Sequence, residues 1–198
     1  MKKPLFSIIV PAHNGETYIR KCLDSIKSQT IRDYELIVVC DACTDKTEEI
    51  AKEYTDKVLT VNYERDGMTR NAGLDAAIGK WVMFLDDDDW WTDNKVLTKV
   101  KATLNEDIDI AFFSFYWQNN GYHRQSEGVR YVAVWNKCWR RSFIGDTRFS
   151  DKKFWSDVDF HKEMMAKNPR CAYYDIPIYY YNFMRVGSIN YRHSHGEE

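Results

Sequence analysis

Four consecutive carboxylates, Asp86 to Asp89, directly follow residues 80–85, a short apolar segment that is typical of a buried strand. Adjacent carboxylates repel one another unless water or a cation lies between them. Mg²⁺ and Mn²⁺ prefer oxygen ligands and commonly share them with substrate phosphates. The run therefore indicates either a divalent metal site at the carboxyl end of a strand, where open α/β sheets bind ligands, or a solvated acidic loop.

A second acidic position follows another predicted strand, residues 34–40. The carboxylate of Asp41 could accept hydrogen bonds from a nucleobase or from ribose hydroxyls. Helix capping is the alternative, and residues 45–48 fit it better because they have the form of a capping box. Cys40 and Cys43 also have the Cys-x-x-Cys spacing of thiol–disulfide enzymes, so redox chemistry is a further alternative.

Two later segments carry residue types suited to phosphate binding and proton transfer. Arg70 follows Gly67 in a loop that leads into a predicted helix over 68–78, where backbone N–H groups and a guanidinium could bind phosphate. An exposed arginine is the simpler explanation. Asp157 and Asp159 stand among aromatic residues, and partial burial could adapt one of them as a general base. Acidic residues favoured by a helix dipole are the alternative.

Composition is that of a soluble globular protein. The 198 residues suit one domain, with 44% hydrophobic and 29% charged residues. A net charge of −2 gives no bulk attraction to nucleic acid or to an anionic membrane. Five cysteines without a disulfide-scaffold pattern suit a reducing cytosol, and no segment has the length of a signal peptide or a membrane span.

The hydrophobic pattern predicts alternating strands and helices in the first half of the chain and a less regular second half. The predicted strands are 5–10, 34–40, 57–61, 80–85, 109–117 and 171–183, and the predicted helices are 16–29, about ten residues from the capping box, 68–78, 94–105 and 155–167. A hairpin or irregular excursion is predicted over 119–135, and a loop over 185–198. This order favours a largely parallel sheet covered by helices on both faces.

Taken together, these segments resemble the family 2 glycosyltransferases, which have the GT-A fold. The resemblance is carried in order by segments along residues 5 to 190. They are Phe6-Ser7-Ile8-Ile9-Val10-Pro11-Ala12-His13-Asn14, Tyr18 through Ile26, Gln29-Thr30, Tyr34 through Val39, Thr44-Asp45, Arg70-Asn71-Ala72-Gly73-Leu74, Phe84 through Trp90, Trp135-Asn136-Lys137 and Tyr181 through Ile189.

The resemblance implies an α/β, Rossmann-like, mostly parallel sheet flanked by helices, with a smaller mixed acceptor-side region. It implies one domain over 1–198, with a nucleotide-sugar half over about 1–92, an acceptor-side half over about 93–190 and a flexible tail over 190–198. The implied reaction moves a sugar from a nucleoside diphosphate, a UDP-sugar by expectation, to an acceptor hydroxyl with inversion at the anomeric carbon.

The resemblance also implies roles for individual residues. Asp157 is expected to be the catalytic base, while Asp88 and Asp86 are expected to hold Mn²⁺ or Mg²⁺. The expected nucleotide-sugar-binding residues are Pro11, Ala12, His13, Glu16, Asp41, Arg70, Asp86 and Asp87. Asp87 and Asp89 are expected to shape the acidic loop rather than to hold the ion.

The implied partners are a nucleotide-sugar donor and a glycan or lipid-linked acceptor, without nucleic acid and with at most peripheral membrane contact. Such an enzyme is expected in the cytoplasm, where a membrane-bound acceptor would bring it to the inner face of the membrane. Two positions depart from the family pattern, Cys40 and Ser156, and they leave open a catalytically impaired sugar- or partner-binding module. A metal-dependent nucleotidyltransferase would need a Gly- and Lys/Arg-rich phosphate loop, which residues 11–16 do not supply.

Overall fold

The computed structural model describes residues 3–117, 121–127 and 131–182. Its strands are β1 (Phe6–Ala12), β2 (Tyr34–Asp41), β3 (Val58–Val61), β4 (Trp81–Phe84), β5 (Trp90–Trp91), β6 (Ile110–Trp117), β7 (Gly121–His123), β8 (Lys137–Arg140) and β9 (Cys171–Tyr181). Its helices are α1 (Ile19–Lys27), α2 (Thr47–Lys52), α3 (Asp66–Ala76), α4 (Val96–Thr103), α5 (Arg141–Ile144) and α6 (Ser156–Ala166).

The described strands form one sheet in the order β3-β2-β1-β4-β8-β6-β9-β5, with β7 paired to β6. Parallel pairing joins β1 to β2, β1 to β4 and β2 to β3. The second half of the chain adds a mixed region, in which β8 runs antiparallel to β4 and β6 while β6 and β9 are parallel. The predicted α/β sheet, mostly parallel in its first half and mixed in its second, is confirmed.

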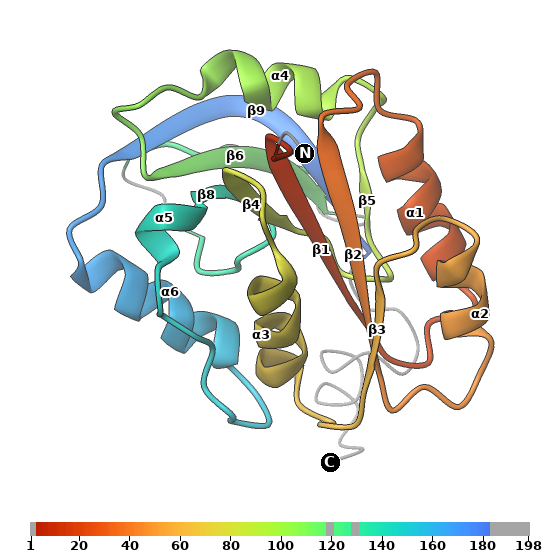
Figure 1. The fold of residues 1–198 in the computed structure, drawn as a ribbon. Helices are drawn as coiled ribbons and strands as arrows, with labels where there is room; N and C mark the ends of the chain where they lie inside the picture. The colour runs from red at the N-terminus through yellow and green to blue at the C-terminus, as the bar shows by residue number, and fades with distance from the viewer. Residues whose placement is uncertain (1–2, 118–120, 128–130, 183–198) are drawn as a thin grey trace.

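An apolar layer lies on each face of the sheet. Figure 1 shows the helices that pack against the sheet. Along β1, Ile8 and Val10 pack with residues of α1, α2 and α4, whereas Ile9 packs on the other face with residues of α3, α5 and α6. Successive strand residues point to opposite faces, so a strand buried on both sides is apolar throughout. This explains the continuous apolar runs in β1, β2 and β4.

Helix α3 lies very close to the sheet at Gly73. A Cβ atom on this glycine would lie 2.4 Å from Cγ2 of Ile9, so only glycine allows the approach. Three residues earlier on the same helix stands Arg70, which is buried. The close packing therefore carries Arg70 to the carboxyl ends of the parallel strands.

Most predicted elements are present with shifted ends, but three short ones were not predicted: β5, β8 and α5. Helix α2 has six residues, not about ten, and begins at Thr47 after the Asp45 carboxylate accepts the Thr47 backbone N–H at 2.9 Å. The hairpin prediction is confirmed where β7 pairs with β6. The predicted loop over 185–198 lies outside the described residues.

No helix in the described part of the chain combines the length and the apolar character needed to cross a membrane.

Candidate functional site

The acidic run alternates in exposure as it leaves β4. Asp86 and Asp88 are half-exposed, whereas Asp87 and Asp89 are 7% and 0% exposed. The half-exposed Asp86 and Asp88 are the residues expected to hold a metal. The buried Asp87 and Asp89 are the residues expected to shape the loop. The run therefore presents two carboxylates to solvent and uses the other two internally.

Asp89 ties the acidic run to the last strand. Its Oδ2 accepts the Tyr179 hydroxyl at 2.5 Å and its Oδ1 accepts the Asn182 backbone N–H at 2.7 Å. The Tyr179 oxygen in turn accepts the Asp86 backbone N–H at 3.2 Å. Burial raises the pKa of Asp89 well above its usual value. Loss of a hydrogen bond to such a buried group would destabilise the fold. Tyr179 thus fixes both ends of the loop that carries Asp88.

We expect Tyr179→Phe to lower the free energy of unfolding by about 1–3 kcal/mol, because a buried carboxylate loses a donor. The same variant should weaken Mn²⁺-dependent nucleotide binding, since Asp86 loses its backbone anchor. Tyr174→Phe is the matched control, because the Tyr174 hydroxyl donates to the Thr103 carbonyl from the same strand, away from the acidic run. Urea unfolding and calorimetric titration of both variants test this; equal nucleotide affinities in the two would contradict it.

Asp87 faces the end of β1. Its Oδ2 accepts the His13 backbone N–H at 3.2 Å. Gly15 leaves the room for this contact, because a Cβ there would lie 2.3 Å from the same oxygen. The Gly15 N–H donates to the Thr47 hydroxyl at 2.7 Å. The loop after β1 is therefore held between the acidic run and the start of α2.

Arg70 is the cation of this site. Its Nη2 pairs with Asp86 Oδ1 at 2.8 Å, and its Nε is buried without a hydrogen-bond partner. Although burial lowers the pKa of Arg70, the charges of Asp86, Asp66 and Asp157 raise it above its usual value. Arg70 thus pairs with the acidic run after β4 and interacts electrostatically with carboxylates at the starts of α3 and α6.

Each carboxylate oxygen of Asp41 accepts two hydrogen bonds from the protein. Its Oδ1 accepts the backbone N–H groups of Tyr63 and Glu64, at 2.6 and 3.0 Å. Its Oδ2 accepts the Arg65 N–H at 3.2 Å and the Thr69 hydroxyl at 2.6 Å. Burial raises the pKa of Asp41, but these four hydrogen bonds together lower it below its usual value. Asp41 therefore anchors the loop between β3 and α3.

We expect Asp41→Asn to lose about 2 kcal/mol of stability at pH 7, because an amide nitrogen cannot accept from the loop N–H groups. A carboxyl whose folded pKa is lowered stabilises the fold above the unfolded value of about 3.9, and this contribution is lost as pH falls through the folded value. The difference from the parent should therefore shrink in acid. Urea unfolding at pH 7 and pH 3 measures it, with the exposed Asp56→Asn as control; a difference that does not depend on pH would contradict it.

The remaining predicted nucleotide-site residues lie at the end of β1 and just beyond it. Pro11 is half-buried and Ala12 is 3% exposed. His13 Nδ1 lies 2.6 Å from the Asp41 carbonyl oxygen, which joins the loops after β1 and β2. The Glu16 carboxylate accepts the Lys46 backbone N–H at 3.1 Å, in the loop between β2 and α2. The structure thus places these residues on β1 and on the loop that follows it.

Sequence reasoning missed Asp66. It opens α3, it interacts electrostatically with Arg70, Asp86, Asp157 and Asp41, and burial raises its pKa while Arg70 opposes the rise. The signal was available, because Asp66 and Arg70 are four residues apart on one helix and so share a face.

An aromatic side chain also reaches this site from the second half of the chain. Tyr131 interacts electrostatically with Asp157 and Asp89, and burial raises its pKa to about 12. The segment is held by Lys137, which is fully buried and whose Nζ donates to the Tyr131 carbonyl at 2.6 Å. Burial lowers the pKa of Lys137 well below its usual value.

Asp86 and Asp88 fit a divalent cation that is completed by a substrate. Within the described residues no group of three His, Cys, Asp or Glu side chains could hold a metal ion by itself. Mg²⁺ and Mn²⁺ are commonly bound by one or two carboxylates together with substrate phosphates. Two half-exposed carboxylates beside a buried arginine supply that incomplete set.

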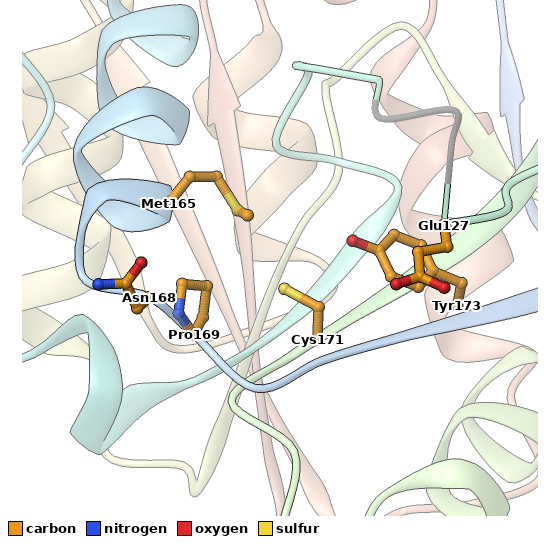
Figure 2. A pocket seen from close by; sticks show the side chains of 6 residues that line it. All are labelled: Glu127, Met165, Asn168, Pro169, Cys171 and Tyr173. Atoms are coloured by element: carbon orange, nitrogen blue, oxygen red, sulfur yellow. The ribbon is translucent and has the colours of Figure 1, made fainter.

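Two hollows in the described part of the chain lie elsewhere. One of about 320 Å³ is formed by the end of α6 and the start of β9, and Figure 2 shows its lining side chains, among them Met165, Pro169 and Cys171. Another of about 510 Å³ lies at the amino ends of the strands, beside Leu5 and Lys80. Neither is lined by any of the site residues described above, so neither is taken as the functional site.

The chain matches the family model described as glycosyl transferase family 2 over residues 7–169. It is 28% identical over 222 residues to glycosyltransferase GlyA of Streptococcus pneumoniae, covering 93% of this chain and 31% of GlyA. It is 33% identical over 120 residues to WfgD of Escherichia coli, a UDP-Glc:alpha-D-GlcNAc-diphosphoundecaprenol beta-1,3-glucosyltransferase, covering 59% of this chain and 47% of WfgD. The chain therefore spans less than half the length of either relative.

Its fold is similar to that of S. aureus TarS 1–349 in complex with UDP-GlcNAc, with a TM-score of 0.80 and 26% identity over 92% of this chain and 59% of TarS 1–349. The fold is thus a GT-A glycosyltransferase fold. The chain belongs to glycosyltransferase family 2.

Proposed function

We propose that this chain moves a sugar from a UDP-sugar to an acceptor hydroxyl, with inversion, in the synthesis of a cell-surface polysaccharide. One observation carries the proposal: the buried Arg70 pairs with Asp86 of the acidic run at the carboxyl end of the sheet and interacts electrostatically with Asp66 and Asp157. An acidic edge with a buried guanidinium suits a diphosphate held through a divalent metal. The named activities of WfgD and the ligand of TarS support a UDP-linked donor.

On the donor side, Asp88 and Asp86 would hold Mn²⁺ or Mg²⁺ against the diphosphate. When bound, the cation supplies Lewis-acid stabilisation of the charge that develops on the leaving nucleoside diphosphate. The guanidinium of Arg70, whose charged form the surrounding carboxylates favour, would attract the diphosphate to this edge.

On the acceptor side, Asp157 stands half-exposed in the first turn of α6. Its carboxylate takes the proton of the acceptor hydroxyl while the hydroxyl oxygen bonds to the anomeric carbon. The bond from that carbon to the diphosphate oxygen breaks on the opposite face, which inverts the configuration. A single base is sufficient for one displacement.

Asp41 is proposed to act on the nucleotide indirectly. Its four hydrogen bonds hold residues 63–65, so direct contact with a base N–H would require the release of one of them. The loop it fixes leads directly into α3 and Asp66. Base recognition thus depends on the loop that Asp41 positions as well as on Pro11 and Ala12.

The acceptor is proposed to be a glycan or a lipid-linked sugar, in line with the name of WfgD. Such an acceptor would place the enzyme in the cytoplasm at the inner face of a membrane. Residues 1–92 are proposed to bind the donor and residues 93–190 the acceptor, as one domain.

The test is calorimetric titration with UDP-, dTDP- and GDP-sugars, with and without Mn²⁺, together with an assay for release of the nucleoside diphosphate. We expect UDP-sugar binding that requires the cation and slow donor hydrolysis. Metal-independent binding of a free sugar without its nucleotide would favour the impaired binding module suggested by Cys40 and Ser156 and would overturn the proposal.

A further inference from the structure

The end of β2 carries two cysteines that the proposed transfer reaction does not use. Cys40 is 0% exposed, and Cys43 is half-exposed. Between them Ala42 adopts φ +48°, a left-handed conformation that is costly for a residue with a Cβ and turns the chain back on itself. The turn and the Cys-x-x-Cys spacing put the two thiols on adjacent sides of the strand end, where they interact with each other.

The thiol pair differs in reactivity. The hydrogen bond from Cys40 lowers the pKa of Cys43 to about 7, while the same contact and burial raise the pKa of Cys40. The charge of His13 lowers the pKa of Cys43, and the charge of Asp45 raises it. The charges of Glu48 and Asp87 raise the pKa of Cys40, as its burial does. The half-exposed Cys43 is therefore partly ionised at neutral pH, while the buried Cys40 keeps its proton.

The position of Cys43 links this pair to the proposed nucleotide site. The Cys43 thiol donates to the Ala12 carbonyl oxygen at 3.5 Å, and the Asn14 backbone N–H interacts with the same sulfur. Asn14 Oδ1 in turn accepts the Thr44 N–H at 2.8 Å. A displaced Cys43 sulfur would therefore loosen the loops after β1 and β2 together.

We propose that Cys40 and Cys43 form a peroxide-sensitive modification site whose disulfide weakens nucleotide binding at the end of β1 and β2, an effect that rests on the proposed donor function. The Cys43 sulfur attacks hydrogen peroxide, the O–O bond breaks, and the sulfur becomes a sulfenic acid while the released hydroxide takes a proton as water. The Cys40 sulfur then loses its proton and attacks Cys43, the S–O bond breaks, and a second water leaves. Two thiols are oxidised to one disulfide as one peroxide is reduced to two waters.

The geometry does not support a thiol–disulfide enzyme. Helix α2 begins at Thr47, four residues beyond Cys43, so the thiolate lacks the helix N-terminus that stabilises the nucleophile of such enzymes. A reversible modification of the nucleotide edge needs no such helix.

The test treats the reduced protein with hydrogen peroxide at neutral pH, maps the cross-linked peptide by tandem mass spectrometry and titrates UDP with Mn²⁺ before and after. We expect a Cys40–Cys43 cross-link, a loss of UDP affinity of about tenfold, and recovery with dithiothreitol. Cys43→Ser should keep its affinity after peroxide, whereas Cys171→Ser should respond as the parent does, because Cys171 is half-buried at the distant hollow of Figure 2.

Absence of the cross-link in the parent, or a cross-link that leaves UDP affinity unchanged, would overturn the inference. If the reduced protein binds no UDP at all, the donor proposal fails separately. Hydrogen exchange then decides the present inference: the Asn14 and Thr44 amides should exchange faster in the cross-linked protein, and unchanged rates would reject it.

Discussion

Replacement of Asp157 by Asn should reduce sugar transfer by about 10²–10⁴-fold and leave donor binding intact, because the amide cannot take the acceptor proton. Asp157 reaches the site from the first turn of α6 and interacts with Arg70, which itself pairs with Asp86. The side chain keeps nearly the same size, so the packing of α6 should be retained. Product formation at saturating donor, followed by chromatography, measures the loss.

Asp159→Asn provides a closely matched control. It lies in the same first turn, so it removes the same favourable charge from the helix N-terminus. Its carboxylate instead pairs with Lys152 at 2.6 Å and accepts the Ser150 hydroxyl, outside the cluster around Arg70. Transfer by this variant should remain within a few-fold of the parent. Equal losses in the two variants would show that Asp157 acts only through helix stability.

Replacement of Asp88 by Ala should remove the Mn²⁺ dependence of donor binding and lower UDP-sugar affinity by about 10²-fold, because a bound cation is worth several kcal/mol of charge stabilisation. Asp88 is half-exposed, and its buried neighbours Asp87 and Asp89 hold the loop. The variant should therefore fold as the parent does. Titration with and without the cation separates lost coordination from a general weakening.

Asp93→Ala is the control for this variant. Asp93 follows the acidic run but pairs with Lys99 at the surface, so its loss should leave UDP-sugar affinity and cation dependence unchanged. An Asp88→Ala protein that still binds the donor only with Mn²⁺ would exclude Asp88 as a ligand. Asp86 would then have to leave Arg70 to hold the cation alone.

The parallel half of the fold could be predicted from sequence because its signals are local and repeated. The strands ending at Ala12, Asp41 and Phe84 are continuous apolar runs, and α1 places its apolar residues at helical spacing. Strand β5 has only two residues and forms because Trp90 and Trp91 pair with Tyr180 and Tyr179 from 90 positions along the chain. No local pattern encodes such a pairing, so tertiary contacts decide it.

The candidate site, like the fold, could be predicted from sequence only in part. Position after a strand made Asp41 and the acidic run candidates, the loop before a predicted helix made Arg70 a candidate, and the family resemblance singled out Asp86 and Asp88 within the run. Their internal partners could not be predicted, because the four hydrogen bonds of Asp41 come from a loop whose path depends on β3 and α3. Sequence reasoning supplies candidates for chemistry, and the packed fold determines which of their acceptor atoms remain available to a ligand.

The ion pair between Arg70 and Asp86 affects how the protein folds. Because a buried guanidinium already balances the carboxylates at this edge, the charge repulsion that would oppose folding is offset from within the chain. The nascent protein can then reach its mature shape before any cation or substrate is encountered. Folding and the proposed binding of the cation are then separate events, and a shortage of divalent ions would stop the proposed transfer without unfolding the protein.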